Sequence, residues 1–160
     1  MRLMVALLAA AIAAGATASP ALAAPSKAKV RKVIEAAGLM GWSAQDCSRP
    51  AGADNAWEQF YVDEEGYVID ADYEGTDGFP MYVVEARRRS NGDIWMRLEV
   101  NLGEPEMDLT LRMDGARHRV WTLRNEPGTT VIQEGQWVQE TGQSQWYTRC
   151  PGPMPQPPVP

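Results

Sequence analysis

Hydrophobic and polar residues alternate with a period of two along the middle of the chain. The stretch "IWMRLEVN" (residues 94–101) places four apolar residues on one face, and "EMDLTLRM" (106–113) repeats the pattern. Such alternation is typical of half-buried antiparallel strands. We therefore expect one face of these two strands to point into the interior, and that face comprises Ile94, Met96, Leu98, Val100, Met107, Leu109, Leu111 and Met113.

Turn signals separate further stretches of this kind. "SNGD" and "MDGA" contain the Asn-Gly and Asp-Gly pairs that tight hairpin turns favour. Besides a first strand that carries Trp42 and the two strands above, the pattern predicts strands at 57–62, 67–74, 80–88, 118–125, 129–134, 136–140 and 145–150.

Short consecutive strands predict an all-β fold. An open sheet of this length would leave two unpaired edges, and pairing of the first strand with the last removes them. We therefore expect an up-and-down antiparallel barrel of about eight strands, with an open β-sandwich as the alternative.

One short helix is expected before the strands. Val30, Val33, Ile34 and Ala37 recur at helical spacing, Ser26 can cap the helix, and Gly38 follows it. Lysines in its first turn oppose the helix dipole, so the helix should be marginal unless it docks on the barrel.

The two ends of the chain differ from its middle. Residues 1–23 combine Arg2, an apolar run and a final Ala-Leu-Ala, which predicts a cleaved signal peptide. Residues 151–160 are rich in proline and predict a disordered tail. We expect a helix or linker at 24–37 and a barrel domain at 38–150, with 24–37 and 151–160 dispensable for the barrel.

Two cysteines, Cys47 and Cys150, enclose nearly all the predicted strands. In an exported protein a pair of cysteines predicts a disulfide, here one that ties the first strand to the last. The closed loop of about 100 residues should stabilise the fold by about 4–5 kcal/mol. A periplasmic or secreted location follows from the signal peptide and the disulfide together.

Charge excludes some partners. The formal net charge is −6, which disfavours binding to nucleic acid. We expect a monomer with no membrane span after signal cleavage, whose partner is a small apolar ligand or an envelope protein.

Candidate catalytic and metal-binding residues are few. His118 is the single histidine, its position beside the Asp114-Gly115 turn suggests an exposed rim, and no nucleophile pattern accompanies it. We therefore expect neither an enzyme nor a cofactor. The weak metal candidates are Asp70, Asp72, Glu74 and Asp77. Because alternate residues of a strand are nearly 7 Å apart, a solvated outer face is the preferred interpretation.

A barrel of about eight strands can be filled by side chains or can hold one small ligand. Methionine suits adaptable apolar cavities. The residues that we expect to line such a cavity are Met96, Leu98, Met107, Leu109, Leu111, Met113 and Trp121.

The stretch "GLMGWSAQDCS" and the closing "WYTRC" carry a resemblance that covers residues 38–150. They resemble lipocalin-like and calycin-like barrels among small exported proteins of Gram-negative bacteria. The resemblance implies binding rather than a reaction. We expect a non-enzymatic exported protein that holds a small apolar or amphipathic ligand; the alternative is a protein-interaction module of the cell envelope, such as an inhibitor of a cell-wall hydrolase.

Overall fold

A computed structural model describes residues 26–73, 78–104, 107–125 and 128–155. In these ranges the chain forms one helix and ten strands: α1 (Lys27–Ala36), β1 (Gly41–Ala44), β2 (Trp57–Val62), β3 (Val68–Tyr73), β4 (Gly78–Arg88), β5 (Ile94–Glu99), β6 (Met107–Asp114), β7 (Arg117–Asn125), β8 (Thr129–Gln133), β9 (Gln136–Trp137) and β10 (Tyr147–Arg149). The predicted signal peptide lies outside the described residues. No helix in the described ranges is long and apolar enough to cross a membrane.

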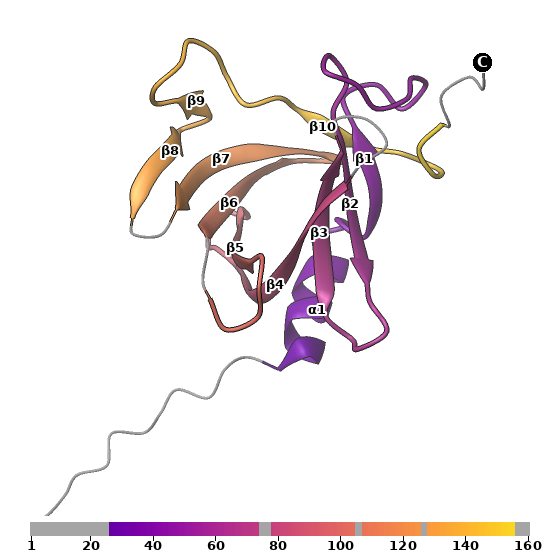
Figure 1. Ribbon diagram of the computed structural model, residues 1–160, viewed down its shortest axis with the longest axis vertical. Helices are drawn as coiled ribbons and strands as arrows, with labels where there is room; N and C mark the ends of the chain where they lie inside the picture. Colours follow the sequence, from indigo (N-terminus) through magenta and orange to yellow (C-terminus); the bar gives the residue numbers. More distant parts are fainter. Residues whose placement is uncertain (1–25, 74–77, 105–106, 126–127, 156–160) are drawn as a thin grey trace, which may run out of the picture.

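The sheet closes into an antiparallel barrel of eight strands, β1 to β7 and β10 (Figure 1). Strand β10 completes the ring because it pairs with β1 on one side and β7 on the other. Its residues oppose Ser43 and Ala44 of β1, and Tyr147 opposes His118 of β7. The predicted pairing of the first strand with the last is therefore confirmed, and the sandwich alternative is excluded.

The β8–β9 hairpin lies outside this ring and is an addition to the expected eight-stranded barrel. One edge of strand β7 pairs with two different strands. Arg117 and His118 pair with β10, whereas residues 122–125 pair with β8. Glu134 and Gly135, both with positive φ, form the two-residue turn that folds β9 back on β8. The chain then crosses the top of the barrel to reach β10 (Figure 1).

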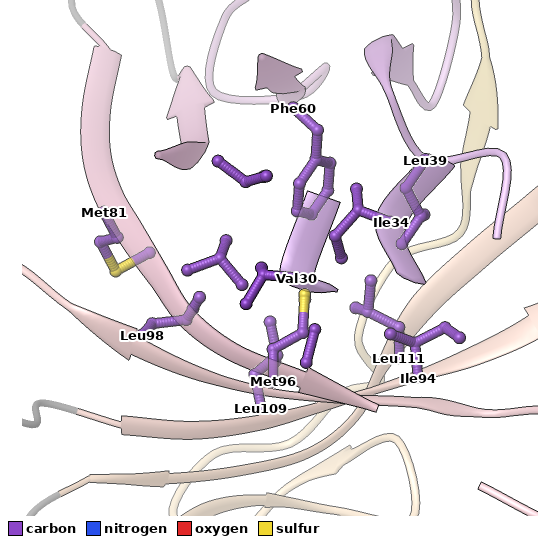
Figure 2. Close-up of a cluster of buried hydrophobic side chains, with 13 residues drawn as sticks. Val30, Ile34, Leu39, Phe60, Met81, Ile94, Met96, Leu98, Leu109 and Leu111 are labelled. Carbon is purple, nitrogen blue, oxygen red and sulfur yellow. The ribbon is translucent and has the colours of Figure 1, made fainter. Parts of the chain in front are cut away.

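Helix α1 fills one end of the barrel. Its residues Val30 and Ile34 are almost completely buried and belong to the same apolar cluster as Phe60, Met96 and Leu111 (Figure 2). Lys27 secures the helix start, because its Nζ donates to the backbone oxygen of Glu65 at 2.9 Å. The helix is thus part of the core, and the expectation that residues 24–37 are dispensable is revised accordingly.

The face predicted from alternation does point inward. Five of its eight residues are buried in the apolar cluster and the other three pack against it; the set is Ile94, Met96, Leu98, Leu109 and Leu111, with Val100, Met107 and Met113. In register, Met96 opposes Leu109 and Ile94 opposes Leu111, which places neighbouring side chains of β5 and β6 on the same face.

A second, smaller cluster surrounds the disulfide between Cys47 and Cys150. Trp57 and Ala44 are fully buried there, and Met154 of the predicted tail packs against them. The bridge lies at the seam, where the Cys150 amide donates to the backbone oxygen of Trp42 at 2.8 Å. Residues 156–160 lie outside the described residues.

One buried side chain orders the loop between β1 and β2. Asn55 is 1% exposed, and its amide nitrogen donates to the backbone oxygens of Asp46, Arg49 and Pro50 at 3.0–3.1 Å. Its side-chain oxygen accepts from the Asp46 amide at 2.9 Å. The loop is therefore held rigidly beside the open end of the barrel.

Candidate functional site

A cavity of about 630 Å³ occupies the part of the barrel interior that helix α1 leaves unfilled. Its apolar wall comes from β4, β5, β6, β7, β8 and β9, and comprises Met81, Leu98, Met107, Leu109, Val120, Leu123, Ile132 and Trp137. Met81, Leu98 and Leu109 also belong to the apolar core around the helix. The cavity is therefore continuous with a packed core at one end and open at the other.

Carboxylates form the opposite side of the cavity. Glu58 comes from β2, and Asp70 and Asp72 come from β3. In register Asp70 opposes Phe60 of β2 and Met81 of β4, both residues of the apolar core. Strand alternation thus carries a carboxyl group into an interior row that is otherwise apolar.

Asp70 is only 2% exposed, so the predicted solvated outer face is wrong for this residue. The reason lies in the strand: Val68, Ile69, Asp70 and Ala71 are all buried. Because β3 is covered on both faces at these positions, the face that carries the polar residues is buried as well, and alternation alone did not show which face is exposed. Asp72 is exposed, at the edge of the cavity. Glu74 and Asp77, the other two metal candidates, lie outside the described residues.

The three carboxyl groups are close together. One oxygen from each of Glu58, Asp70 and Asp72 lies within 4.8 Å of the others. Asp70 Oδ1 is buried without a hydrogen-bond partner among the described residues. Burial raises the pKa of Asp70 well above its usual value, and the negative charges of Glu58 and then Asp72 raise this pKa further. A cation placed among these oxygens would relieve both effects.

His118 is buried beside this acidic group, so its predicted position on an exposed rim is wrong. Only 3% of the residue is exposed, and its Nε2 contacts Glu58 Oε2. The imidazole stacks on the ring of Tyr147, with ring centroids 5.6 Å apart and planes 10° apart. Barrel closure explains the burial, because the pairing of β10 with the start of β7 covers a residue next to a turn.

The structure divides the predicted cavity residues into three groups. Leu98, Met107 and Leu109 line the cavity. Met96 and Leu111 are fully buried in the apolar core, and Met113 packs against that core.

Trp121 has a different position, under the guanidinium groups of Arg112 and Arg119, whose central carbons lie 3.7 and 5.1 Å from its ring centroid. Trp121 is the extra residue of a β-bulge, since Val120 opposes Leu111 and Thr122 opposes Thr110. The bulge lets Val120 and Leu123 both face the cavity although they are three residues apart.

Two loops and the outer hairpin surround the opening of the cavity. Ala53, Asp54 and Ala56 come from the loop that Asn55 orders, and residues 143–145 come from the segment before β10. The Ser144 amide donates to the backbone oxygen of Gly135 at 2.8 Å, which ties this segment to the β8–β9 turn. Trp137 of the hairpin lines the cavity and remains 38% exposed.

Sequence reasoning missed Glu58 and Tyr147 as site residues. A signal for Glu58 was present, because it lies two positions from Phe60 in "WEQFYV" and alternation places both on one face. A charged residue in phase with the apolar face of a strand is a mark of a functional interior. Comparisons with protein-family models, with curated proteins and with solved structures found no match to this chain.

Proposed function

We propose that this protein is a non-enzymatic binding barrel that holds one small amphipathic molecule. The observation that carries the proposal is a single cavity with an apolar wall on one side and three carboxyl groups on the other. Its volume of about 630 Å³ lies in the range of about 300–1,000 Å³ that small-molecule sites occupy. An apolar tail would lie against Leu98 and Leu109, and a polar head would face Asp70.

A binding role without a reaction agrees with the surroundings of His118. Catalysis by a histidine requires an imidazole that can reach substrate. The His118 ring is nearly inaccessible and is engaged by Glu58 and by the Tyr147 ring. This pair supports the barrel wall rather than offering a base to the cavity.

The disulfide supports a location outside the reducing cytosol, because such bridges persist in oxidising compartments. We extend this to a periplasmic or secreted protein of the lipocalin-like kind, on the strength of the signal-like residues 1–23 and the resemblance described above. N-terminal sequencing of protein from the periplasm or medium tests the extension, which requires a mature chain that begins near residue 24.

The binding proposal is tested by titration with a neutral apolar dye such as N-phenylnaphthylamine, whose fluorescence rises in an apolar site. We expect saturable binding of one dye per protein. Leu123→Trp would fill the cavity and should weaken dye binding about tenfold or more, an effect of about 1.4 kcal/mol. Arg124→Trp is the matched control, since Arg124 is exposed on the same strand. The absence of saturable binding to the native protein would refute the proposal.

A second candidate function is that of a protein-interaction module, such as an inhibitor of a cell-wall hydrolase. The β8–β9 hairpin favours it, because the hairpin lies outside the ring and exposes 38% of Trp137 and 53% of Val138. Exposed aromatic and aliphatic residues of this kind can anchor a partner. Dose-dependent inhibition of a muramidase that Trp137→Ala abolishes, without any dye binding, would favour this alternative.

A further inference from the structure

We propose that the cavity selects a cationic amphiphile, a molecule with an apolar body and a protonated amine that lies between Glu58, Asp70 and Asp72. The inference deepens the proposed binding function and depends on it. The shape of an apolar cavity does not determine the charge of its ligand, whereas the carboxyl groups in this cavity favour a positive charge.

The charged side chains that line the cavity in the described residues are all acidic. Three carboxyl groups converge, with one oxygen of each within 4.8 Å of the others. Among the described residues, His118 contacts this group, with its Nε2 against Oε2 of Glu58. A neutral ligand would leave buried Asp70 beside the like charges of Glu58 and Asp72, whereas an anion would be repelled by them.

One carboxyl oxygen of this acidic group is buried and unsatisfied. Asp70 Oδ1 is buried, lacks a hydrogen-bond partner among the described residues, and belongs to a side chain that lines the cavity. A buried polar atom without a partner is costly in a folded protein. An ammonium group carries three N–H donors and can serve three carboxyl groups at once.

The residues around Asp70 favour an amine over a metal ion. Calcium takes six to eight oxygen ligands, and zinc prefers nitrogen and sulfur. The cross-strand neighbours of Asp70 are Phe60 and Met81, whose side chains supply neither an oxygen ligand nor the thiolate or imidazole that binds zinc. An organic cation can bind to both kinds of residue. Its carbon atoms can pack against Met81 and the adjoining apolar wall while its nitrogen contacts the carboxyl groups.

Aromatic rings add to the same preference. Tyr73 and Tyr147 both line the cavity, and the face of a tyrosine ring attracts ammonium groups. Tyr73 is held in place by Trp42, with ring centroids 5.3 Å apart, and by a hydrogen bond from its hydroxyl to Gln59 Oε1 at 3.3 Å. These contacts position the ring before a ligand arrives.

Three ligands with one tail and different heads test the inference: decylamine, decanol and decanoate, each used at neutral pH to displace N-phenylnaphthylamine from the native protein. We expect decylamine to bind about tenfold or more tightly than decanol, and decanoate to bind more weakly than decanol. In Asp70→Asn the preference for the amine over the alcohol should fall to about threefold or less, with decanol affinity unchanged.

Two more variants make the test specific. Asp72→Asn alters an exposed carboxyl group at the edge of the cavity, so it should fold normally and should also reduce the preference for the amine. Asp108→Asn removes a carboxylate that pairs with Arg97 at 3.1 Å, away from the cavity, and should leave all three affinities unchanged.

The outcomes separate the two proposals. Equal affinity for the three ligands would overturn the charge preference and leave the binding function standing, whereas failure of the dye to bind would remove both. A rise in the melting temperature with calcium, magnesium or manganese ions, lost in Asp70→Asn and without any preference for decylamine, would overturn the amine in favour of a metal ion.

Discussion

Glu58 of β2 and His118 of β7 meet inside the barrel through Oε2 and Nε2, with less than a tenth of either side chain exposed. The two strands are not neighbours, because β10 and β1 lie between them in the ring. The contact therefore joins β2 and β7 inside the barrel, across the place where β10 closes the ring. The disulfide between Cys47 and Cys150 joins the segments that follow β1 and β10 at the same place.

A double-mutant cycle measures this link. Glu58→Gln, His118→Gln and the double variant should show a coupling energy of about 0.5–3 kcal/mol, because buried polar residues in contact are rarely additive. Urea denaturation gives the four free energies of unfolding. Additive effects of the two substitutions would mean that the contact contributes nothing to the closed barrel.

Asp70→Asn should stabilise the protein without ligand by about 1–3 kcal/mol at neutral pH. Asparagine is neutral and can donate to Glu58 and Asp72, so it avoids a buried charge among like charges. Urea denaturation of both proteins checks this, with Asp108→Asn, a half-buried residue outside the cavity, as the control of equal charge change. A loss of stability in Asp70→Asn would show that the Asp70 carboxylate already has a compensating partner.

The gain from Asp70→Asn should depend on pH in one direction. The pKa of Asp70 is raised in the folded protein, first by burial and then by Glu58 and Asp72. Between the usual pKa of aspartic acid and this raised pKa, the folded state binds more protons than the unfolded state, so stability of the native protein falls as pH rises. The difference between variant and native protein should accordingly shrink as pH falls, and should be smallest below the usual pKa of aspartic acid, where Asp70 is protonated in both states.

Two leucines of β6 separate packed core from cavity wall. Leu111 is fully buried in the apolar core, whereas Leu109 also lines the cavity. Leu111→Ala should cost about 2–5 kcal/mol of the free energy of unfolding. Leu109→Ala should cost less, since one side of the residue already lacks packed neighbours, and it should change dye affinity as Leu111→Ala does not. Equal costs and unchanged dye binding would place both residues in a filled interior.

Helix α1 provides the next prediction. Ile34 is completely buried against the barrel interior, so Ile34→Ala should lower the free energy of unfolding by about 2–5 kcal/mol. Lys32→Ala, an exposed change in the same helix, should have an effect below about 0.5 kcal/mol. A chain shortened to begin at residue 38 that unfolds as cooperatively and at the same denaturant concentration as the full chain would contradict this role for the helix.

The disulfide gives a prediction about the unfolded chain. Cys47 and Cys150 are 103 residues apart, so their bond restricts most of the denatured protein. Reduction should lower stability by about 4–5 kcal/mol on the loop-entropy model, and less if the reduced chain keeps residual structure. Thiol titration of denatured, unreduced protein should find no free thiol, and two reactive thiols would disprove the bond.

Local patterns predicted the strands well because alternation and turn residues act over short distances. The inward face of β5 and β6 follows from period two, and closure follows from the need to pair two edges. The outer position of the β8–β9 hairpin could not be read in this way, because β8 and β10 compete for the same edge of β7 and only the whole barrel decides which residues each one takes. Asp70 was placed outside because charge favours solvent, and His118 because it lies beside a turn. Their burial results instead from tertiary contacts with strands far away in the sequence.

Strand β10 has a consequence for the order in which the protein assembles. Its three residues, Tyr147–Arg149, are almost the last of the described chain, yet both edges of the ring depend on them. A chain that leaves a ribosome or an export channel from its N-terminus therefore exposes β1 as an unpaired edge until Tyr147–Arg149 have emerged. We expect barrel closure and cysteine oxidation to be the last folding events, and pulsed alkylation during refolding should trap Cys47 as a free thiol until the apolar core around α1 has formed.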